Sequence, residues 1–272
     1  MPTSPATSDD PRFQPVRTAY EPSLWADSSL RFGLVVLDTD HASERELRRM
    51  LPESGEIFVS RMRHGGDCDL AHLTAMGDQF AIAASLLLPG TALDGIAFSC
   101  TSGTAAIGID AVRRAVEPYH PGTPVISPIT AARAAFDELG VTRVAVLTPY
   151  VDEVNRMLVQ HIEDEGIGVT VLANFGLHTD AEIASVPAEA VAAAAREMDR
   201  AGAEGLFISC TGLRVGRIIE PLEAELGLPV VTSNQAMAWD LLRQAGHAQP
   251  VEGYGELMRR LGNKEGTANG RE

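Results

Sequence analysis

Two stretches of this 272-residue chain repeat the same change from apolar to polar sequence, and that repeat constrains the fold more than any other feature. Residues 96–104 read IAFSCTSGT and residues 205–213 read GLFISCTGL, so each apolar run ends in Ser-Cys-Thr. The two cysteines, Cys100 and Cys210, lie 210 − 100 = 110 residues apart. A short apolar run predicts a buried strand, and the small polar residues after it are typical of a turn into a helix. We therefore interpret the two stretches as halves of one site.

Strand-like and helix-like segments alternate along the rest of the chain. The predicted strands are 31–37, 56–62, 96–100, 124–127, 143–150, 168–173, 205–209 and 229–232. The predicted helices are 44–50, 70–88, 104–116, 130–139, 152–165, 187–201, 215–226, 234–245 and 254–261. Strands that alternate with helices of this length are typical of parallel sheets with right-handed crossovers.

The two halves of this pattern match each other. The stretch 93–96 corresponds to 203–206, and 124–127 corresponds to 229–232, which are offsets of 203 − 93 = 110 and 229 − 124 = 105 residues. We predict an α/β fold of two duplicated Rossmann-like units with parallel sheets, related by a pseudo-two-fold axis, with the active site in the cleft between them. The predicted segments are a flexible N-terminal tail (1–29), a first unit (30–130 plus 234–261), a second unit (131–233) and a C-terminal tail (262–272).

The amino-acid composition excludes some classes of binding partner. The net charge is −15 and no run of Lys or Arg occurs, which argues against nucleic acid or an anionic membrane. The N-terminus lacks the basic start and apolar core of a signal peptide, and no segment approaches about 18 uninterrupted apolar residues. The three cysteines form no Cys-x-x-Cys pair and do not indicate a disulfide framework. We expect a soluble cytoplasmic homo-oligomer whose partner is a small carboxylate substrate.

A cysteine at a helix N-terminus sees free backbone N–H groups and the positive end of the helix dipole, and both lower its pKa. A lone cysteine is more often a buried core residue, and we assign that role to Cys68, which has no counterpart in the other half. The paired positions of Cys100 and Cys210 favour a functional role. No histidine repeats in this way, and His41, at the end of the first strand, is only a weak candidate partner for a nucleophilic cysteine.

Two opposed thiols suit chemistry on both faces of one carbon, in which one sulfur removes a proton or attacks and the other returns a proton. That is racemisation, epimerisation or cis–trans isomerisation, and it needs no cofactor. A redox pair is an alternative, but the usual motif is missing. No P-loop, no Gly-x-Gly-x-x-Gly after the first strand and no cluster with metal-ligand spacing occurs, so we expect neither a cofactor nor a metal.

Several polar residues at the predicted strand ends are candidate substrate ligands. A carboxylate cradle is expected from the residues that follow each cysteine, although capping of the next helix is the alternative role. Thr39, Asp40 and Tyr150 lie at the ends of the first strand of each half, and a tyrosine there favours binding of a carboxylate. Asparagines at strand ends are weaker candidates because asparagine is common in turns. The predicted substrate-binding residues are Thr101, Ser102, Tyr150, Thr211, Gly212, Thr39, Asp40 and Asn174.

These motifs resemble the aspartate/glutamate racemase superfamily, and within it the branch of maleate cis–trans isomerases and arylmalonate decarboxylases. The resemblance covers about residues 31–247. The runs 99–103 (SCTSG), 147–151 (LTPYV), 209–211 (SCT) and 232–235 (TSNQ), with 37–40 (LDTD) and 43–45 (SER), are especially similar to the ectoine-utilisation group called EutA. The resemblance implies a nucleophile or base at Cys100, an acid or second base at Cys210, and carboxylate binding by Tyr150, Thr101 and Thr211.

The resemblance also suggests what the substrate carries. Arylmalonate decarboxylases have a glycine at the position of Cys100, which argues against decarboxylation. Maleate isomerases have an asparagine where this chain has Asp40, and an aspartate there would repel a second carboxylate but suit an ammonium group. The expected activity is a cofactor-independent racemase or isomerase acting on an amino-acid-like carboxylate, such as an intermediate of ectoine or hydroxyectoine breakdown. A maleate isomerase-like enzyme and a non-catalytic small-molecule binder are the alternatives.

Overall fold

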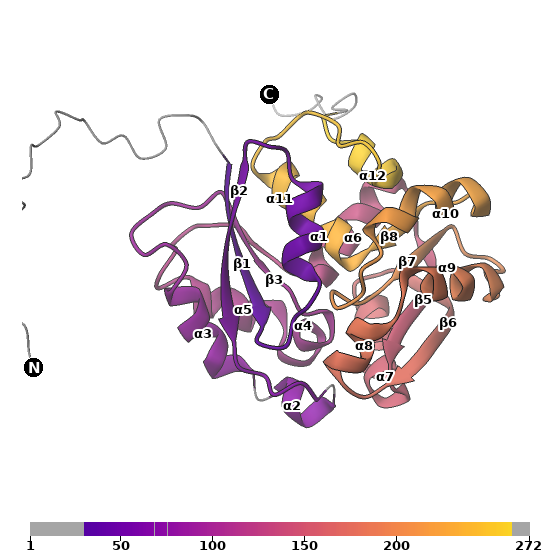
Figure 1. Cartoon of the computed structure of the whole chain (residues 1–272), viewed down its shortest axis with the longest axis horizontal. Helices are drawn as coiled ribbons and strands as arrows, with labels where there is room; N and C mark the ends of the chain where they lie inside the picture. Colours follow the sequence, from indigo (N-terminus) through magenta and orange to yellow (C-terminus); the bar gives the residue numbers. More distant parts are fainter. Residues whose placement is uncertain (1–29, 68, 75, 263–272) are drawn as a thin grey trace, which may run out of the picture.

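The fold consists of two four-stranded parallel sheets with the same strand order. A computed structural model describes residues 30–67, 69–74 and 76–262 (Figure 1). The sheet orders are β2-β1-β3-β4 and β6-β5-β7-β8, so the predicted duplication and fold class are confirmed. The strands are β1 (Leu30–Leu37), β2 (Gly55–Met62), β3 (Gly95–Phe98), β4 (Val125–Ile126), β5 (Arg143–Tyr150), β6 (Gly168–Leu177), β7 (Gly205–Ile208) and β8 (Val230–Thr232). The predicted tail 1–29, residues 263–272 of the predicted C-terminal tail, and Cys68 lie outside the described residues.

Helices follow the strands as parallel crossovers require. In the first half they are α1 (Ser43–Met50), α2 (Leu70–Thr74), α3 (Gly77–Ser85), α4 (Thr101–Ile107), α5 (Ile109–Val116) and α6 (Pro128–Leu139). In the second half they are α7 (Asp152–Asp164), α8 (Asp180–Ser185), α9 (Ala188–Glu197), the short 3₁₀ turn η2 (Gly216–Ile218), α10 (Ile219–Leu226), α11 (Ser233–Gln244) and α12 (Gly255–Arg259). In the part of the chain that the structure describes, no helix is both long and apolar enough to cross a membrane.

Four predicted helices differ from the observed ones. The helix expected over 70–88 is observed as the two helices α2 and α3, and α3 ends at Ser85. The helix expected over 104–116 starts at Thr101 and is broken into α4 and α5 by Gly108, whose φ of 78° is incompatible with helix continuation. The helix expected from residue 215 begins later, because residues 211–215 form a turn and a loop before η2. The stretch expected as one helix over 187–201 ends at Glu197 and is preceded by α8, which was not predicted.

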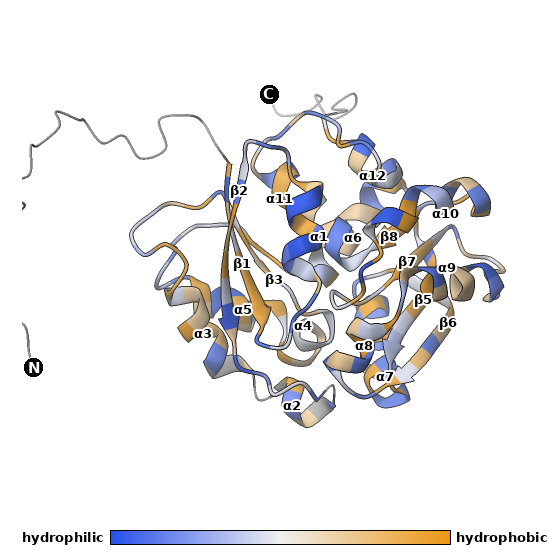
Figure 2. Cartoon of the chain, viewed as in Figure 1, coloured by the Kyte–Doolittle hydropathy of each residue, from blue (hydrophilic) through white to orange (hydrophobic). Residues whose placement is uncertain are grey.

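The inner strands of each sheet have side chains buried on both faces, whereas the edge strands β2 and β6 are partly exposed. All residues of β3 and β7 are buried, and six of the eight residues of β1 are buried. The hydrophobic residues of β1 are coloured orange in Figure 2. Continuous apolar runs of this kind are typical of parallel strands covered by helices. Parallel pairing then places the carboxyl ends of β1, β3, β5 and β7 at matching edges of the two sheets.

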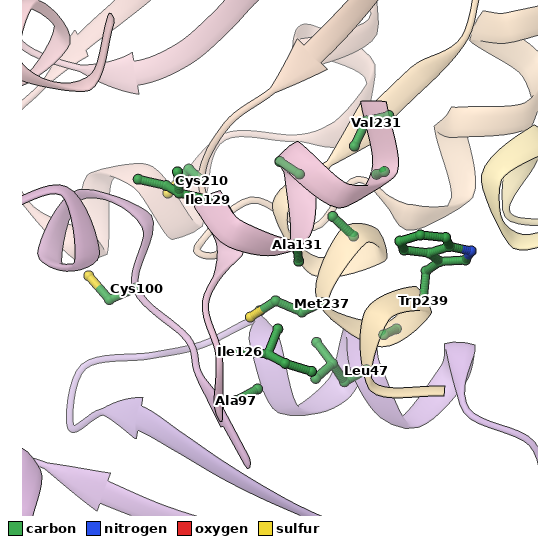
Figure 3. Packing of buried hydrophobic residues seen from close by; sticks show 14 of the residues in the cluster. Leu47, Ala97, Cys100, Ile126, Ile129, Ala131, Cys210, Val231, Met237 and Trp239 are labelled. Atoms are coloured by element: carbon green, nitrogen blue, oxygen red, sulfur yellow. The ribbon is translucent and has the colours of Figure 1, made fainter. Parts of the chain in front are cut away.

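Helices α6 and α11 each pack against elements of the other half. Helix α6 follows the first sheet, but its Phe136 packs edge-to-face on Phe207 of β7, with ring centroids 5.7 Å apart. Helix α11 follows the second sheet, yet it packs against α6, α1 and β3, and a Cβ at Gly95 of β3 would lie 2.9 Å from Leu241 of α11. Met237 and Trp239 of α11 belong to the same buried cluster as Leu47 of α1 (Figure 3). These contacts hold the halves together. The division into residue segments remains a prediction.

Candidate active site

The carboxyl ends of strands from both sheets enclose one small cavity. Its volume is about 20 Å³, roughly the room that one water molecule needs. The first half contributes Leu37, Thr39, Asp40, His41, His64, Leu73, Cys100, Thr101 and Ser102, and the second half contributes Tyr150, Asp180, Ala184, Cys210, Thr211 and Gly212. Among the described residues that line the cavity there is no lysine or arginine. The two cysteines therefore share one enclosed space that has acidic side chains but no permanent cation.

Cys100 is the N-cap residue of α4. Its extended backbone (φ −150°, ψ 111°) ends the strand, and its Sγ accepts a hydrogen bond from the backbone N–H of Gly103 at 3.2 Å. The Ser102 hydroxyl lies 3.8 Å from the same sulfur. Burial raises the pKa of the Cys100 thiol to about 12, although the Gly103 N–H acts in the opposite direction. The Gly103 N–H and the Ser102 hydroxyl thus favour a Cys100 thiolate, and burial disfavours it.

Cys210 has different neighbours. No helix starts directly after it, and its Sγ accepts a hydrogen bond from the backbone N–H of Gly212 at 3.3 Å. Burial raises the pKa of the Cys210 thiol to about 12, and a side-chain hydrogen bond with Tyr150 opposes that effect. Tyr150 ends β5 and is 2% exposed. The hydroxyl of Tyr150 therefore favours the thiolate of Cys210, as the first turn of α4 favours the thiolate of Cys100.

The expected lowering of the two thiol pKa values is wrong. Both cysteines are buried, and the desolvation of a thiolate outweighs the N–H donors. The carboxylate of Asp180 raises the pKa of both thiols further. The sequence displays a helix start, but it does not display the depth at which the sulfur lies. A group that accepts the thiol proton, or a ligand that brings positive charge, is needed to form a thiolate at neutral pH.

Asp40 is held by a short network behind the cavity. Its Oδ1 accepts hydrogen bonds from the backbone N–H groups of Ala42 (3.1 Å) and Ser43 (3.0 Å), and its Oδ2 accepts from the Ser43 hydroxyl at 2.5 Å. The Ser43 hydroxyl in turn accepts from the Ser99 hydroxyl at 2.7 Å. Burial raises the pKa of the Asp40 carboxyl, and the hydrogen bonds from Ser43 oppose that rise. Asp40 therefore caps the start of α1 and presents a carboxyl to the cavity.

Asp180 faces the cavity from the other half. It accepts a hydrogen bond from the Thr39 hydroxyl, which joins the β1–α1 loop to the start of α8. The backbone N–H of Asp180 donates to the Gly66 carbonyl at 3.0 Å, and Asp67 forms an antiparallel bridge with Thr179. The loop that follows β2 is thus fastened across the cavity to the second half. The carboxyl groups of Asp40 and Asp180, one from each half, therefore line the same cavity.

The cavity brings together every predicted site residue except Asn174. Thr101 and Thr211 line it, but their hydroxyls already have protein partners. Thr101 Oγ1 lies 3.0 Å from the Ser233 hydroxyl, and Thr211 Oγ1 donates to the Ser99 carbonyl at 3.2 Å. Asn174 is exposed within β6, which continues to Leu177, so its position does not support the prediction. The catalytic and binding roles of the lining residues remain predictions.

Sequence reasoning missed His64 and Asp180. His64 lies in the loop after β2, and Asp180 is the first residue of α8. A signal for Asp180 was present, because Thr179 and Glu182 form a capping box at the start of a helix after a strand. The signal for His64 was weaker. It follows a strand next to β1, where loops at the carboxyl ends of parallel strands meet ligands.

The part of the chain that the structure describes contains no group of three or more His, Cys, Asp or Glu residues placed to hold a metal ion. Two parallel α/β halves that enclose a pair of cysteines fit the Asp/Glu racemase-like superfamily. The chain belongs to the arylmalonate decarboxylase family, whose sequence model matches residues 110–258.

Named relatives fall in two groups. Arylmalonate decarboxylase from Bordetella bronchiseptica is 35% identical over 140 residues, which are 50% of this chain and 58% of that protein. Maleate isomerase from Nocardia farcinica is 32% identical over 122 residues, which are 44% of this chain and 49% of the relative. These matches thus span about half of each relative. The solved structure of a cysteine-to-serine variant of the N. farcinica maleate cis-trans isomerase, with a covalently bound succinylcysteine intermediate, covers 85% of this chain and 98% of its own, with a TM-score of 0.78 and 25% identity.

Proposed function

We propose that this protein is a cofactor-independent racemase or isomerase of a small carboxylate, in which Cys100 and Cys210 act on opposite faces of one carbon. The observation that carries the proposal is the pair of buried thiols, supplied by equivalent strand ends of the two halves, in one small cavity. One sulfur removes a proton or attacks, and the other delivers a proton from the opposite side. The succinylcysteine intermediate of the N. farcinica relative supports a cysteine nucleophile in this fold.

The charges around the cavity favour a substrate that carries an amino group beside its carboxylate. Asp40 and Asp180 both line the cavity, and the described lining residues offer no lysine or arginine. A dicarboxylate would bring two more negative charges into this enclosed space, whereas an ammonium group would offset the carboxylates that are already there. We therefore propose an amino-acid-like substrate. The specific suggestion of a diaminobutyrate derivative from ectoine or hydroxyectoine breakdown rests on the EutA-like sequence runs.

The donors that follow each cysteine suit the reaction intermediate. Removal of a proton from the carbon next to a carboxylate leaves an enediolate, whose oxygens need hydrogen-bond donors. Backbone N–H groups after Cys100 and Cys210, together with the Ser102 and Tyr150 hydroxyls, lie at the cavity. In this proposal the two oxygens of the substrate carboxylate are bound between the halves, which leaves the reacting carbon between the two sulfurs.

A maleate isomerase-type activity is the second candidate, because the N. farcinica relative is a maleate isomerase. One experiment separates the readings. Protein in D₂O is incubated with a panel that includes both enantiomers of 2,4-diaminobutyrate, their N-acetyl derivatives, other small amino acids, and maleate. Proton NMR follows loss of the Cα–H signal and formation of fumarate. Deuterium at Cα of an amino carboxylate supports the proposal, and conversion of maleate alone supports the second candidate. Thermal stabilisation by a panel compound without exchange or conversion contradicts both and indicates a non-catalytic binder.

A further inference from the structure

His64 is a buried side chain with no partner in the structure. It is 9% exposed, and neither Nδ1 nor Nε2 has a hydrogen-bond partner. Only its backbone is engaged, through a hydrogen bond from the His64 N–H to Asp38 Oδ1 at 3.0 Å. A buried polar group left without a partner is destabilising, because it has lost its hydrogen bonds to water. Such a group in a native fold needs an explanation, and a role in a ligand site is one.

The position of His64 in the cavity explains why its imidazole has no protein partner. Its side chain lines the same cavity of about 20 Å³ as both cysteines. The other titratable groups that face this cavity are Asp40, His41, Tyr150 and Asp180, and Asp38 lies behind the His64 backbone. An imidazole both takes up and releases a proton between about pH 5 and 8. His64 is therefore suited to exchange protons with the thiols.

The other candidate bases are worse placed. Asp40 already accepts three hydrogen bonds, and Asp180 accepts one from Thr39. His41 is exposed. A base is needed because burial raises the pKa of both thiols and so disfavours the thiolate.

We propose that His64 is the catalytic base that takes the proton of one cysteine thiol and returns it to the other cysteine after turnover. This inference rests on the proposed two-thiol function. In the forward direction the imidazole removes the proton of the first thiol, giving imidazolium and thiolate. The thiolate removes the substrate Cα proton and becomes a thiol, and the electron pair of the C–H bond moves into the carboxylate as an enediolate.

The second half of the cycle restores every group. The enediolate electrons form a new C–H bond with the proton of the opposite thiol, which becomes a thiolate. The imidazolium then gives its proton to that thiolate. Protons and charges balance, and one histidine serves both cysteines in both directions of the reaction. A single base between two duplicated half-sites explains why no histidine repeats between the halves of the sequence.

The test measures thiol reactivity and needs no substrate. Wild-type protein and the His64→Gln variant are alkylated with iodoacetamide between pH 5 and 9, and peptide mass spectrometry follows Cys100 and Cys210 separately. In wild-type protein we expect both cysteines to be alkylated readily at pH 7.5. In His64→Gln we expect rates at pH 7.5 at least tenfold lower that rise only as the thiols themselves ionise. Superimposable profiles would overturn the proposal.

His120 provides a matched control. It is also buried, and its Nε2 also lacks a partner, but it does not line the cavity. His120→Gln should therefore keep the wild-type alkylation profile, and a loss equal to that of His64→Gln would point to general loosening and count against the proposal. As a second variant, His64→Ala is alkylated with and without added imidazole. Recovery of the rate with imidazole supports the base role, and no recovery in folded protein contradicts it.

The same variants separate this inference from the proposed function. If His64→Gln turns over a panel compound at the wild-type rate, the role of His64 is wrong while the two-thiol activity stands. If His64→Gln slows alkylation but wild-type protein turns over no panel compound, His64 acts as the base and the proposed substrate class is wrong.

Discussion

The two half-sites have the same strand end but different surroundings after it. Cys100 is followed at once by α4, and its sulfur faces the first turn of that helix. Cys210 is followed by a loop, and Tyr150 from the neighbouring strand supplies the second donor. The strand ends position both sulfurs, while the segments after them differ. Duplication has therefore preserved the placement of the two thiols and not the way in which each thiolate is stabilised.

Because of that difference, the two thiolates depend on different kinds of hydrogen-bond donor. The main donor for Cys100 is the backbone N–H of Gly103, which side-chain substitution cannot remove, whereas the main donor for Cys210 is the phenol of Tyr150. Substitutions should therefore affect the two cysteines unequally, and alkylation of each cysteine measures that inequality directly.

The largest effect is expected from removal of either thiol. Cys100→Ser and Cys210→Ser should each lower turnover by about 10²- to 10⁴-fold, because a serine hydroxyl is a far weaker base. Each variant should keep slow Cα exchange for one enantiomer only, and the favoured enantiomer should differ between them. Proton NMR in D₂O on the compound found in the panel measures this. Cys68→Ser, expected from the sequence to be silent, is the control. Substantial racemisation without either cysteine would end the two-thiol mechanism.

Tyr150→Phe tests whether the two cysteines depend on different donors. Loss of a hydrogen bond to a charged group costs about 1.5–3 kcal/mol, so the rate of alkylation of Cys210 should fall by roughly 10- to 100-fold. The rate for Cys100 should stay within about twofold, because Tyr150 is not among the groups that shift its pKa. Equal slowing of both cysteines would mean that the phenol supports the cavity as a whole.

Asp40→Asn should act in the opposite direction on the same cysteine. The Asp40 carboxylate raises the pKa of Cys210. Its removal should lower that pKa, which moves the rise in Cys210 alkylation to lower pH. A smaller shift is expected at Cys100. The pH dependence of alkylation in the presence and absence of the substitution measures both, and a shift to higher pH would contradict the sign.

The smallest expected effect is on stability, and it concerns the glycines next to the two sulfurs. A Cβ at Gly103 would lie 2.8 Å from the Cys100 Sγ and 3.1 Å from the Met76 side chain, whereas at Gly212 the nearest atom is Ile183 Cγ2 at 3.0 Å. Gly103→Ala should lower the free energy of unfolding by about 1–3 kcal/mol, and Gly212→Ala should lower it by less. Urea unfolding measures both. The reverse order would show that the loop after Cys210 is the more tightly packed of the two.

The parts that the sequence predicts and the parts that it does not have different physical origins. The strands and the two cysteines were predictable, because apolar runs that end in small polar residues report burial directly. The site residues on the turns next to these strands followed from that placement. His64 lies two residues after β2 and Asp180 begins α8, but their approach to the cavity depends on how the loop after β2 is fastened to the second half. A local sequence pattern does not display that long-range contact. The thiol pKa values were predicted with the wrong sign for a similar reason, since burial depth is a property of the assembled halves.

Helix α11, which packs on the first half, has a consequence for how the protein is made. It covers part of the first sheet, at β3, and it packs against α1, but it begins 233 − 95 = 138 residues after β3 begins. During synthesis the chain emerges N-terminus first, so the apolar surface at β3 stays without its helix until the second half has left the ribosome. Contacts between residues this distant in sequence also slow folding. We expect nascent chains that stop before residue 233 to depend on chaperones, and the cavity between the cysteines to form only when synthesis is nearly complete.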